Sequence, residues 1–249
     1  MSAAIEVDTR AGVTVIRFDR PEAENALTVA MLAAAADALV LGERDGRIRA
    51  FVLAGSPGCF SVGSDLRELL GFADSGRMDD GVARFLKTLA TVEKPIVAAV
   101  DGLAIGLGAT VLLHCDYVVA SEWSAFEATF VELGLIPDAA STLLAPRAMG
   151  QQRAFEFLVL GERFDAQRAQ ESGLVNRIVA AELVEPTALE IAGRLASRPK
   201  EAVGAARRLI RGDRREILAR IDQEASANGE RLRSPIARDT IVAYMRKAR

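Results

Sequence analysis

Residues 94–109 decide the fold, and they read KPIVAAVDGLAIGLGA. The run Ile96–Val100 contains no polar side chain, which is typical of a strand that is buried on both faces of a parallel sheet. Asp101-Gly102 then predicts a turn, and the residues that follow favour a helix over about 105–114. The stretch therefore predicts a buried strand, a tight turn and a helix that begins among glycines.

The same order of elements occurs elsewhere in the chain. Residues 49–54 are a short apolar run, residues 55–58 read GSPG, and a helical pattern starts near Ser64. Further strands are expected at 5–9, 13–18, 117–120 and 176–179, and further helices at 28–41, 79–92, 141–149, 151–159 and 165–172. Strands that alternate with helices predict an α/β architecture.

From Glu182 onward the pattern is helical only, with breaks at Pro199, Gly212 and Ser234-Pro235. We find no linker, no low-complexity stretch and no sequence repeat. We therefore expect one domain, with an α/β core over residues 1–190 and an all-helical lobe over residues 191–249 that belongs to the same domain.

Composition limits the classes of protein that the chain can represent. A chain of 249 residues with 50% hydrophobic residues can bury a large core as a single domain. The 2 cysteines lack metal-type spacing and the chain has 1 histidine, so we expect neither a disulfide framework nor a metal site. No apolar run is long enough for a membrane span and the first ten residues do not resemble a signal peptide, which predicts a cytoplasmic protein.

Charge is distributed unevenly along the chain. Residues 191–249 carry 15 Lys/Arg against 7 Asp/Glu, whereas residues 1–190 carry 16 against 27. A basic helical segment can meet a phosphorylated ligand, nucleic acid or an acidic neighbouring subunit, or it can be an ordinary solvated helix face. The arginines are scattered without interleaved aromatic side chains, so we do not expect nucleic-acid binding.

Two glycine-containing segments lie where an expected strand meets an expected helix. Residues 60–66 read FSVGSDL and residues 104–109 read AIGLGA. The first turn of a helix has unpaired amide donors, and glycine lets a ligand approach the backbone closely. Each segment alone is explained by close packing of helix on strand, but two such junctions that face one pocket would form an oxyanion hole.

Seven blocks in order resemble the crotonase family, whose members are enoyl-CoA hydratases and isomerases. The blocks cover nearly the whole chain, and they are Arg20-Pro21 with Asn25-Ala26-Leu27, residues 60–66, residues 94–102, Cys115-Asp116, residues 133–137, Pro146-Arg147 with Gly150, and Ala169 with Gly173-Leu174-Val175. The resemblance implies a crotonase-like core, a superhelix of ββα units, followed by a helical C-terminal trimerisation lobe. It also implies a homotrimer or dimer of trimers and an acyl-CoA thioester substrate, with coenzyme A as part of the substrate and no separate cofactor.

The same resemblance assigns residues to the site. The two oxyanion donors fall on the amides of Ser64 and Leu107. The residues expected to contact the acyl-CoA are Ser61, Val62, Gly63, Ser64, Asp65, Leu66, Gly106, Leu107, Thr110 and Phe130. The two glutamates that hydratases of the family use correspond to Thr110 and Phe130, and neither is an acid, so ordinary hydration is not expected.

Asp138 is a carboxylate at a position that isomerase branches of the family use as a base. The resemblance therefore implies an enoyl-CoA isomerase, in which one carboxylate shuttles a proton while the two amides stabilise a dienolate. The neighbours of Asp138 in the sequence carry no charge and could raise its pKa by desolvation. The alternative for Asp138 is a helix N-cap, which would lower the pKa, although Ser141 could cap that helix instead.

Other functions remain as alternatives. They are a hydratase or another enolate-forming reaction, a dehalogenase-like reaction, and a non-catalytic acyl-CoA or RNA-binding homologue. Dehalogenase-like branches use a histidine before Lys94, and residues 79–93 contain none. His114 is expected to be a buried structural side chain, Glu132 is a reserve acid, and Arg20 and the basic tail are candidates for the CoA phosphates.

Overall fold

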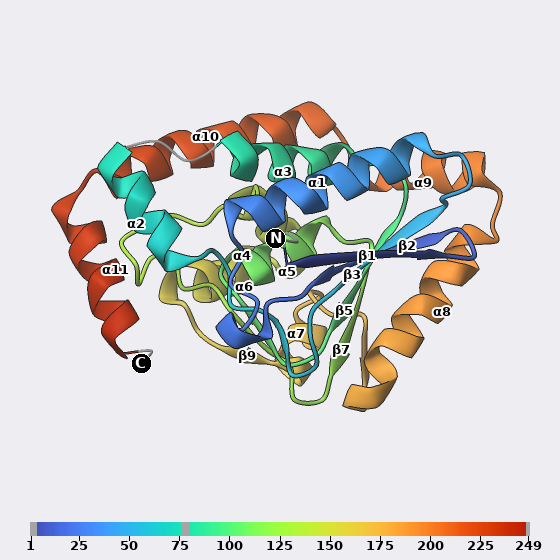
Figure 1. Ribbon diagram of the computed structural model, residues 1–249, viewed down its shortest axis with the longest axis horizontal. Helices are drawn as coiled ribbons and strands as arrows, with labels where there is room; N and C mark the ends of the chain where they lie inside the picture. Colours follow the sequence, from blue (N-terminus) through green and yellow to red (C-terminus); the bar gives the residue numbers. More distant parts are fainter. Residues whose placement is uncertain (1–3, 76–79, 248–249) are drawn as a thin grey trace.

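Two sheets carry the α/β part of the chain (Figure 1), and the strands between residues 50 and 127 alternate between them. The computed structural model describes residues 4–75 and 80–247. In spatial order, the large sheet contains β1 (Ile5–Arg10), β2 (Val13–Phe18), β3 (Ala50–Ala54), β5 (Ile96–Val100), β7 (Tyr117–Ser121) and β10 (Arg177–Val179). The small sheet contains β4 (Cys59–Ser61), β6 (Leu103–Ile105), β8 (Ala125–Glu127) and β9 (Phe164–Asp165). Because β3, β5 and β7 are each followed by a strand of the small sheet, the core is the crotonase-type arrangement of ββα units.

The helices follow the expected order. The α-helices are α1 (Val29–Arg44), α2 (Leu66–Ser75), α3 (Asp80–Thr91), α4 (Leu107–Thr110), α5 (Ser141–Met149), α6 (Gln151–Phe155), α7 (Ala166–Glu171), α8 (Val184–Ala196), α9 (Lys200–Arg211), α10 (Arg214–Leu232) and α11 (Pro235–Lys247). Short 3-10 helices lie at η1 (Pro21–Ala23), η2 (Val111–His114) and η4 (Ala181–Leu183), and a π-helix, η3, at Glu156–Leu160. The helix expected from residue 79 begins at Asp80, and residue 79 lies outside the described residues.

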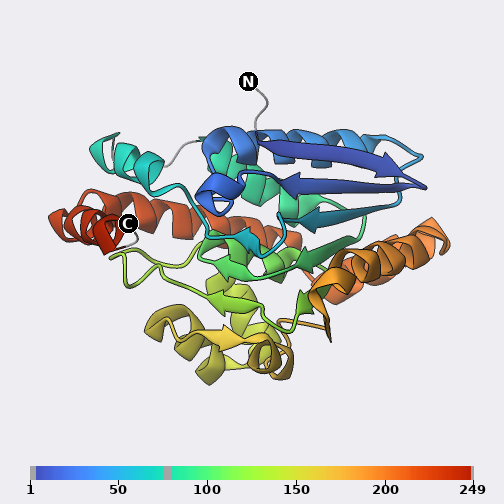
Figure 2. The same ribbon diagram turned by 60° about the horizontal axis from the view of Figure 1, so that its bottom comes forward.

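The large sheet is buried on both faces, as its apolar strands predict. Successive side chains of a strand point to opposite faces. In β3, Ala50, Val52 and Ala54 pack with α8 in one hydrophobic cluster, whereas Phe51 and Leu53 pack in the larger cluster with residues of α1 and α3. Figure 2 shows the sheet between these helical layers. The rigid sheet thus fixes the position of each strand end.

The last two helices, α10 and α11, pack against helices of the α/β core. Helix α10 contacts α2, α3 and α5, and α11 contacts α2. The boundary expected between residues 190 and 191 falls inside α8, which packs against β3, β5 and β7 and so covers the sheet. None of the helices in the described residues is both long and apolar enough to cross a membrane.

The small sheet is the main feature that the sequence did not predict. The helix expected over 105–114 begins at Leu107, because residues 103–105 pair with β4 on one side and β8 on the other. Its strands are two or three residues long, which is too short for a hydrophobic period to be visible. This sheet brings the two glycine segments together.

Candidate active site

The two glycine segments leave neighbouring strands side by side. Strands β4 and β6 are parallel, and Ser61 pairs with Ala104. Ser64 and Leu107 each lie three residues beyond their member of that pair. Parallel strands that end at the same edge of a sheet deliver the residues after them to one place, so the two expected donors are neighbours.

The contact between the segments depends on Gly63. Its φ is +88°, and a Cβ at this position would lie 2.7 Å from the carbonyl oxygen of Ile105 and 3.2 Å from the amide nitrogen of Leu107. Gly106 has φ +55°, which is also unfavourable for other residues. Glycine therefore permits both the backbone turn and the approach of one segment to the other.

The amides of Ser64 and Leu107 are free to donate. Leu27 donates to the carbonyl of Gly63 at 2.7 Å and accepts from the amide of Asp65 at 2.9 Å, and these bonds bracket Ser64 without using its N–H. Leu107 is the first residue of α4, so its N–H has no partner within the helix. Among the described residues, neither amide has a hydrogen-bond acceptor.

Both residues line a cavity of about 270 Å³. The sequence-predicted residues in its wall are Val62, Gly63, Ser64, Leu66, Gly106, Leu107, Phe130 and Asp138. The wall is completed by Glu24, Ala26, Leu69, Phe72, Val82, Leu103, Ile105, Thr129, Leu133, Leu135, Asn228, Leu232 and Tyr244. The cavity therefore combines two free amides and the carboxyl groups of Asp138 and Glu24 with a largely apolar wall.

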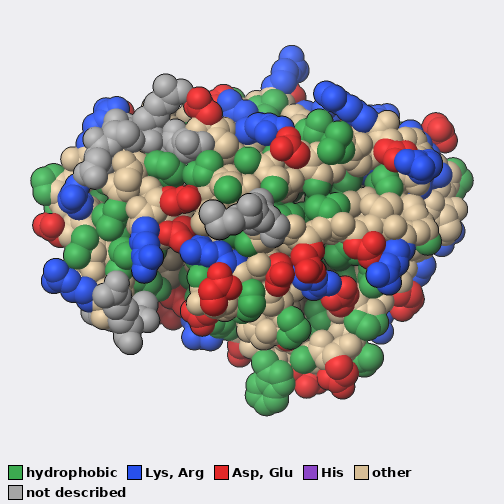
Figure 3. Space-filling model, viewed as in Figure 1, with side chains coloured by type: hydrophobic (Ala, Val, Ile, Leu, Met, Phe, Trp, Pro, Cys, Tyr) green, Lys and Arg blue, Asp and Glu red, His purple; other side chains and the backbone are tan. Residues whose placement is uncertain are grey.

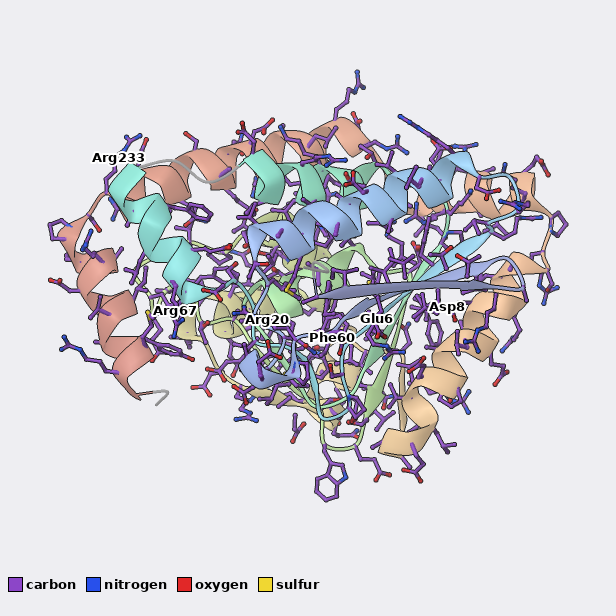
Figure 4. All side chains as sticks on the ribbon, in the orientation of Figure 1. Glu6, Asp8, Arg20, Phe60, Arg67 and Arg233 are labelled. Carbon is purple, nitrogen blue, oxygen red and sulfur yellow. The ribbon has the colours of Figure 1, made fainter. Side chains whose placement is uncertain are left out.

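Ser61 and Asp65 hold the loop and do not line the cavity. The hydroxyl of Ser61 donates to the carbonyl of Asn25 at 2.8 Å, and the amide of Gly63 donates to that hydroxyl at 3.0 Å. Asp65 accepts from the guanidinium of Arg20 at 2.8 Å and from the amide of Arg67 at 2.9 Å. Figure 4 shows Arg20 and Arg67 near the start of α2, where Asp65 precedes the helix. Asp65 thus caps α2.

Asp138 is buried at the cavity wall, with 7% of its surface exposed. The hydroxyl of Thr110 donates to its Oδ1 at 2.8 Å. Burial raises the pKa of Asp138 to about 7, the hydrogen bond from Thr110 opposes this rise, and the negative charge of Glu224 adds to it. A carboxyl group with such a pKa exists in both protonation states near neutral pH.

Asp138 does not cap the helix that follows it. The N-cap residue of α5 is Ala140, and no side chain of the cap residue is hydrogen-bonded to the helix. The carboxylate of Glu224 in α10 takes this place and accepts from the amide of Ala140 at 2.6 Å and from the amide of Thr142 at 3.1 Å. Ser141, the other expected cap, has a buried hydroxyl without a partner among the described residues. The expected capping alternatives are therefore wrong, because a distant helix supplies the acceptor.

Thr110 and Phe130 stand where the resemblance placed hydratase glutamates. Thr110 is fully buried behind the cavity, and its side chain contacts Asp138 and not the cavity. Phe130 lines the cavity with an apolar ring. Neither side chain can hold and deprotonate a water molecule as a carboxylate does.

Three residues of the C-terminal helices reach the cavity and were missed by sequence reasoning. They are Asn228 and Leu232 in α10 and Tyr244 in α11. The side chain of Asn228 donates to the carbonyl of Ile136 and accepts from its amide, both at 2.9 Å. A signal was present in α10, where Glu224 and Asn228 interrupt the buried apolar stripe that contains Ile217, Ile221 and Leu232.

His114, Glu132 and two arginines of the basic tail do not line the cavity. His114 is buried, its Nε2 lies 2.7 Å from the carbonyl of Ala139, and burial lowers its pKa to about 4. Two arginines of the basic tail, Arg207 and Arg211, bind Asp116 at 2.7 and 3.1 Å. Glu132 is exposed and absent from the cavity wall. In the described part of the chain, no group of three or more His, Cys, Asp and Glu side chains could hold a metal ion.

The chain is similar to known proteins over almost its full length. The model of the family described as enoyl-CoA hydratase/isomerase matches residues 8–245. The 1,2-epoxyphenylacetyl-CoA isomerase of Escherichia coli (strain K12) is 33% identical over 243 residues, which are 95% of this chain and 93% of that protein. A probable enoyl-CoA hydratase of Rhizobium meliloti (strain 1021) is 35% identical over 194 residues, or 77% and 74% of the two chains.

Solved structures agree with this relationship. The crystal structure of an enoyl-CoA hydratase/isomerase from Pseudoalteromonas atlantica T6c has a TM-score of 0.91 and 37% identity, and covers 98% of this chain and 97% of that chain. The structure of OdaA from Pseudomonas aeruginosa has a TM-score of 0.92 and 34% identity, with 98% and 99% covered. With its ββα core and two neighbouring free amides, the protein belongs to the enoyl-CoA hydratase/isomerase family, in the crotonase superfamily.

Proposed function

We propose that the protein is an enoyl-CoA isomerase that moves the double bond of a 3-enoyl-CoA to position 2. The observation that carries the proposal is that the buried Asp138 lines the same cavity as Ser64 and Leu107, whose amides are free. Glu24, the other carboxyl group in the cavity wall, is an exposed side chain.

One carboxylate is sufficient for this reaction. Asp138 takes a proton from C2, and the electron pair of that C–H bond moves toward the thioester carbonyl to give a dienolate. The protonated Asp138 then returns the proton to C4, and the double bond comes to rest between C2 and C3. No water is consumed and the proton is reused, so the atoms balance.

The two amides would stabilise the negative oxygen of the dienolate. Donors that are already oriented cost no reorganisation during the reaction, and loss of one such donor typically lowers kcat by about 10²–10³-fold. A pKa of Asp138 near 7 makes it a stronger base than ordinary aspartate while it still exchanges protons near neutral pH. These properties support a proton shuttle.

The apolar wall of the cavity favours a substrate with an uncharged acyl group. The side chains beyond the reacting groups are mainly Leu66, Leu69, Phe72, Val82, Leu133, Leu135 and Leu232. A carboxylate at the far end of the acyl chain would lose its hydration there without gaining a partner. We therefore propose an aliphatic or aromatic acyl-CoA as the substrate, with coenzyme A entering only as part of the thioester.

Hydration of a 2-enoyl-CoA is the second candidate, because several relatives are named hydratases. The apolar and hydroxyl side chains at positions 130 and 110 argue against it. One relative is named 1,2-epoxyphenylacetyl-CoA isomerase, so we include 1,2-epoxyphenylacetyl-CoA as a third substrate in the test below.

The test compares wild type with Asp138→Asn and Glu24→Gln on 3-enoyl-CoA, 2-enoyl-CoA and 1,2-epoxyphenylacetyl-CoA. We expect isomerisation of 3-enoyl-CoA that Asp138→Asn reduces by about 10³-fold or more and that Glu24→Gln leaves nearly unchanged. Isomerisation that survives Asp138→Asn would refute the proposed base. Hydration of 2-enoyl-CoA without isomerisation would favour the second candidate, and binding without turnover of any substrate would refute an enzymatic role.

The assembly is proposed as a homotrimer or a dimer of trimers. The resemblance to the family implies it, and the apolar side chains of Leu209 and Ile210 on α9, each 85% exposed, are compatible with a covering subunit. Multi-angle light scattering of the purified protein measures the mass directly, and a monomer at micromolar concentration would contradict the proposal.

A further inference from the structure

The first turn of α5 is satisfied by a carboxylate from another helix. Glu224 of α10 accepts from the amide of Ala140 at 2.6 Å, and from the amide and the hydroxyl of Thr142 at 3.1 and 2.6 Å. Its side chain is buried, with 2% of the residue exposed. Both carboxylate oxygens are therefore engaged with the start of the helix that follows Asp138.

Asp138 precedes this helix closely and belongs to a residue type that readily caps helices. Its carbonyl accepts from the amide of Ser141 at 2.9 Å, but its carboxyl group receives no amide of the α5 turn. The side chain instead receives the hydroxyl of Thr110. Glu224 thus occupies the donors that would otherwise attract the Asp138 carboxylate.

The backbone between Asp138 and α5 is strained, and hydrogen bonds from other elements hold it in place. Ala139 and Ala140 are successive non-glycine residues with φ of 60° and 55°, and left-handed residues cost about 1–2 kcal/mol each. Glu224 fixes the amide of Ala140, and the ring of His114 lies at hydrogen-bond distance from the carbonyl of Ala139. The strained pair separates the Asp138 side chain from the helix that it could cap.

We propose that Glu224 is a positioning residue that keeps Asp138 uncapped, directed at the cavity and basic. It acts through the α5 turn, because it is absent from the cavity wall and has no place for contact with substrate. The inference rests on the proposed role of Asp138 as the proton shuttle.

The charged and titratable groups around the pair are few. Asp138 faces Thr110 from α4 and Glu224 from α10, with the neutral His114 of η2 behind Ala139. Glu224 faces Thr142 of α5 and the charge of Arg220 in its own helix, and Arg220 also donates to the Thr142 hydroxyl at 2.9 Å. Burial raises the pKa of Glu224, while its hydrogen bonds to Thr142 and Ala140 and the charge of Arg220 oppose this rise. The negative charge of Glu224 in turn raises the pKa of Asp138.

The test is the variant Glu224→Gln, which removes the negative charge of the side chain and keeps its shape. Its matched control is Glu216→Gln, because Glu216 also connects α10 to α5, through an exposed ion pair with Arg147 at 2.6 Å. The readout is the pH dependence of kcat/KM for isomerisation of 3-enoyl-CoA. We expect Glu224→Gln to move the acid limb down by about one pH unit and to lower the plateau by about tenfold, since Asp138 becomes a weaker base. Glu216→Gln should leave both unchanged.

A lower plateau with an unmoved acid limb would mean that Glu224 is only a structural cap, and would overturn the proposal. A second measurement covers the case in which Glu224→Gln does not fold. Carbon NMR of glutamate-labelled protein would follow the Glu224 carboxyl, whose pKa should fall in Asp138→Asn because the coupling is reciprocal. An unchanged Glu224 pKa would also overturn the proposal. Isomerisation that survives Asp138→Asn would refute the proton shuttle itself, which is a different outcome.

Discussion

Asp138 is a carboxyl group whose ionisation the fold opposes. Burial raises its pKa to about 7, so the base is protonated in acid and ionised above neutral pH. We predict that kcat/KM for isomerisation rises with pH and reaches a plateau, with a midpoint near pH 7. Initial rates between pH 5 and 9 measure this, in the range where the protein keeps its circular dichroism spectrum. A rate that is constant from pH 5 to pH 9 would show that the pKa of the base is not raised, and would contradict the prediction.

The same shift predicts a cost in stability. The folded pKa lies above the unfolded value, so the folded state binds the proton more tightly, and this stabilisation is lost as pH rises through about 7. Asn cannot ionise, and Asp138→Asn should therefore raise the free energy of unfolding at pH 8 by up to about 4 kcal/mol. At pH 4 little gain is expected, because Asp138 is then protonated. Urea denaturation at the two pH values checks the sign, and an equal effect at both would contradict it.

Thr110 acts on the pKa of Asp138 in the opposite direction to Glu224. Its hydroxyl stabilises the carboxylate, and it is fully buried, so Thr110→Val removes the donor with little change of shape. We expect the acid limb of kcat/KM to move to higher pH, whereas Glu224→Gln moves it lower. The two pH profiles measured side by side provide the comparison, and a shift of both variants in the same direction would contradict the account.

At the scale of elements, the junction of β4 with α2 and that of β6 with α4 form one unit. Gly63 is the point where these segments touch, and a Cβ there would meet the carbonyl oxygen of Ile105 at 2.7 Å. A shift of either segment would move an amide away from the position proposed for the thioester oxygen. Such a shift affects catalysis more than stability.

We therefore predict that Gly63→Ala lowers kcat/KM by about 10²-fold or more. The matched control is Gly58→Ala, because Gly58 also has a positive φ, +81°, but a Cβ there meets no atom within 4 Å. Both variants should lose about 1–2 kcal/mol of stability from the backbone conformation alone. Thermal denaturation and steady-state kinetics separate the effects, and equal activity of the two variants would refute the contact argument.

The helix α10 connects the C-terminal part of the chain with the cavity. Glu224 and Asn228 are one turn apart, so they lie on the same face and hold both ends of the segment that contains Asp138. The expectation of a lobe for oligomerisation did not include this role. Hydrophobic periodicity predicts that α10 is a helix, but its role at the cavity depends on the segment that it contacts.

At the scale of the whole molecule, the basic C-terminal helices are joined to the sheet by Asp116. It accepts from Arg207, whose side chain is 8% exposed, from Arg211, and from the amide of Ile96 at 2.8 Å. Figure 3 shows blue and red side chains interspersed over the face that it displays. Part of the charge asymmetry along the sequence is therefore balanced inside the fold.

Removal of that carboxylate should destabilise the molecule. Asp116→Asn leaves the buried guanidinium of Arg207 with less charge compensation. Because Asp116 itself is exposed, we expect a loss smaller than the about 3–5 kcal/mol that removal of one partner costs in a fully buried ion pair. The control is Asp213→Asn, whose partner Arg215 is exposed. Melting temperatures of the two variants give the comparison, and a similar small shift for both would show that the Asp116 cluster contributes little.

The sequence predicted most of the elements and indicated candidate residues for the chemistry. Its apolar runs predicted β3, β5 and β7, its breaks at residues 199, 212 and 235 predicted the C-terminal helices, and its motifs indicated Ser64, Leu107 and Asp138. The elements follow from periodicity and local turn chemistry, which act over a few residues and can be seen in one segment. The three site residues follow from the resemblance to the family.

The contacts between these residues depend on how distant segments of the chain pack together. The small sheet places the two free amides together. Glu224, which lies 84 residues from Ala140 and 82 residues from Thr142 in the sequence, accepts from the start of α5 and leaves Asp138 uncapped at the cavity. Burial and a neighbouring charge then set the pKa of Asp138. Burial, long-range hydrogen bonds and charge neighbours depend on distances between segments, and no pattern within one segment contains those distances.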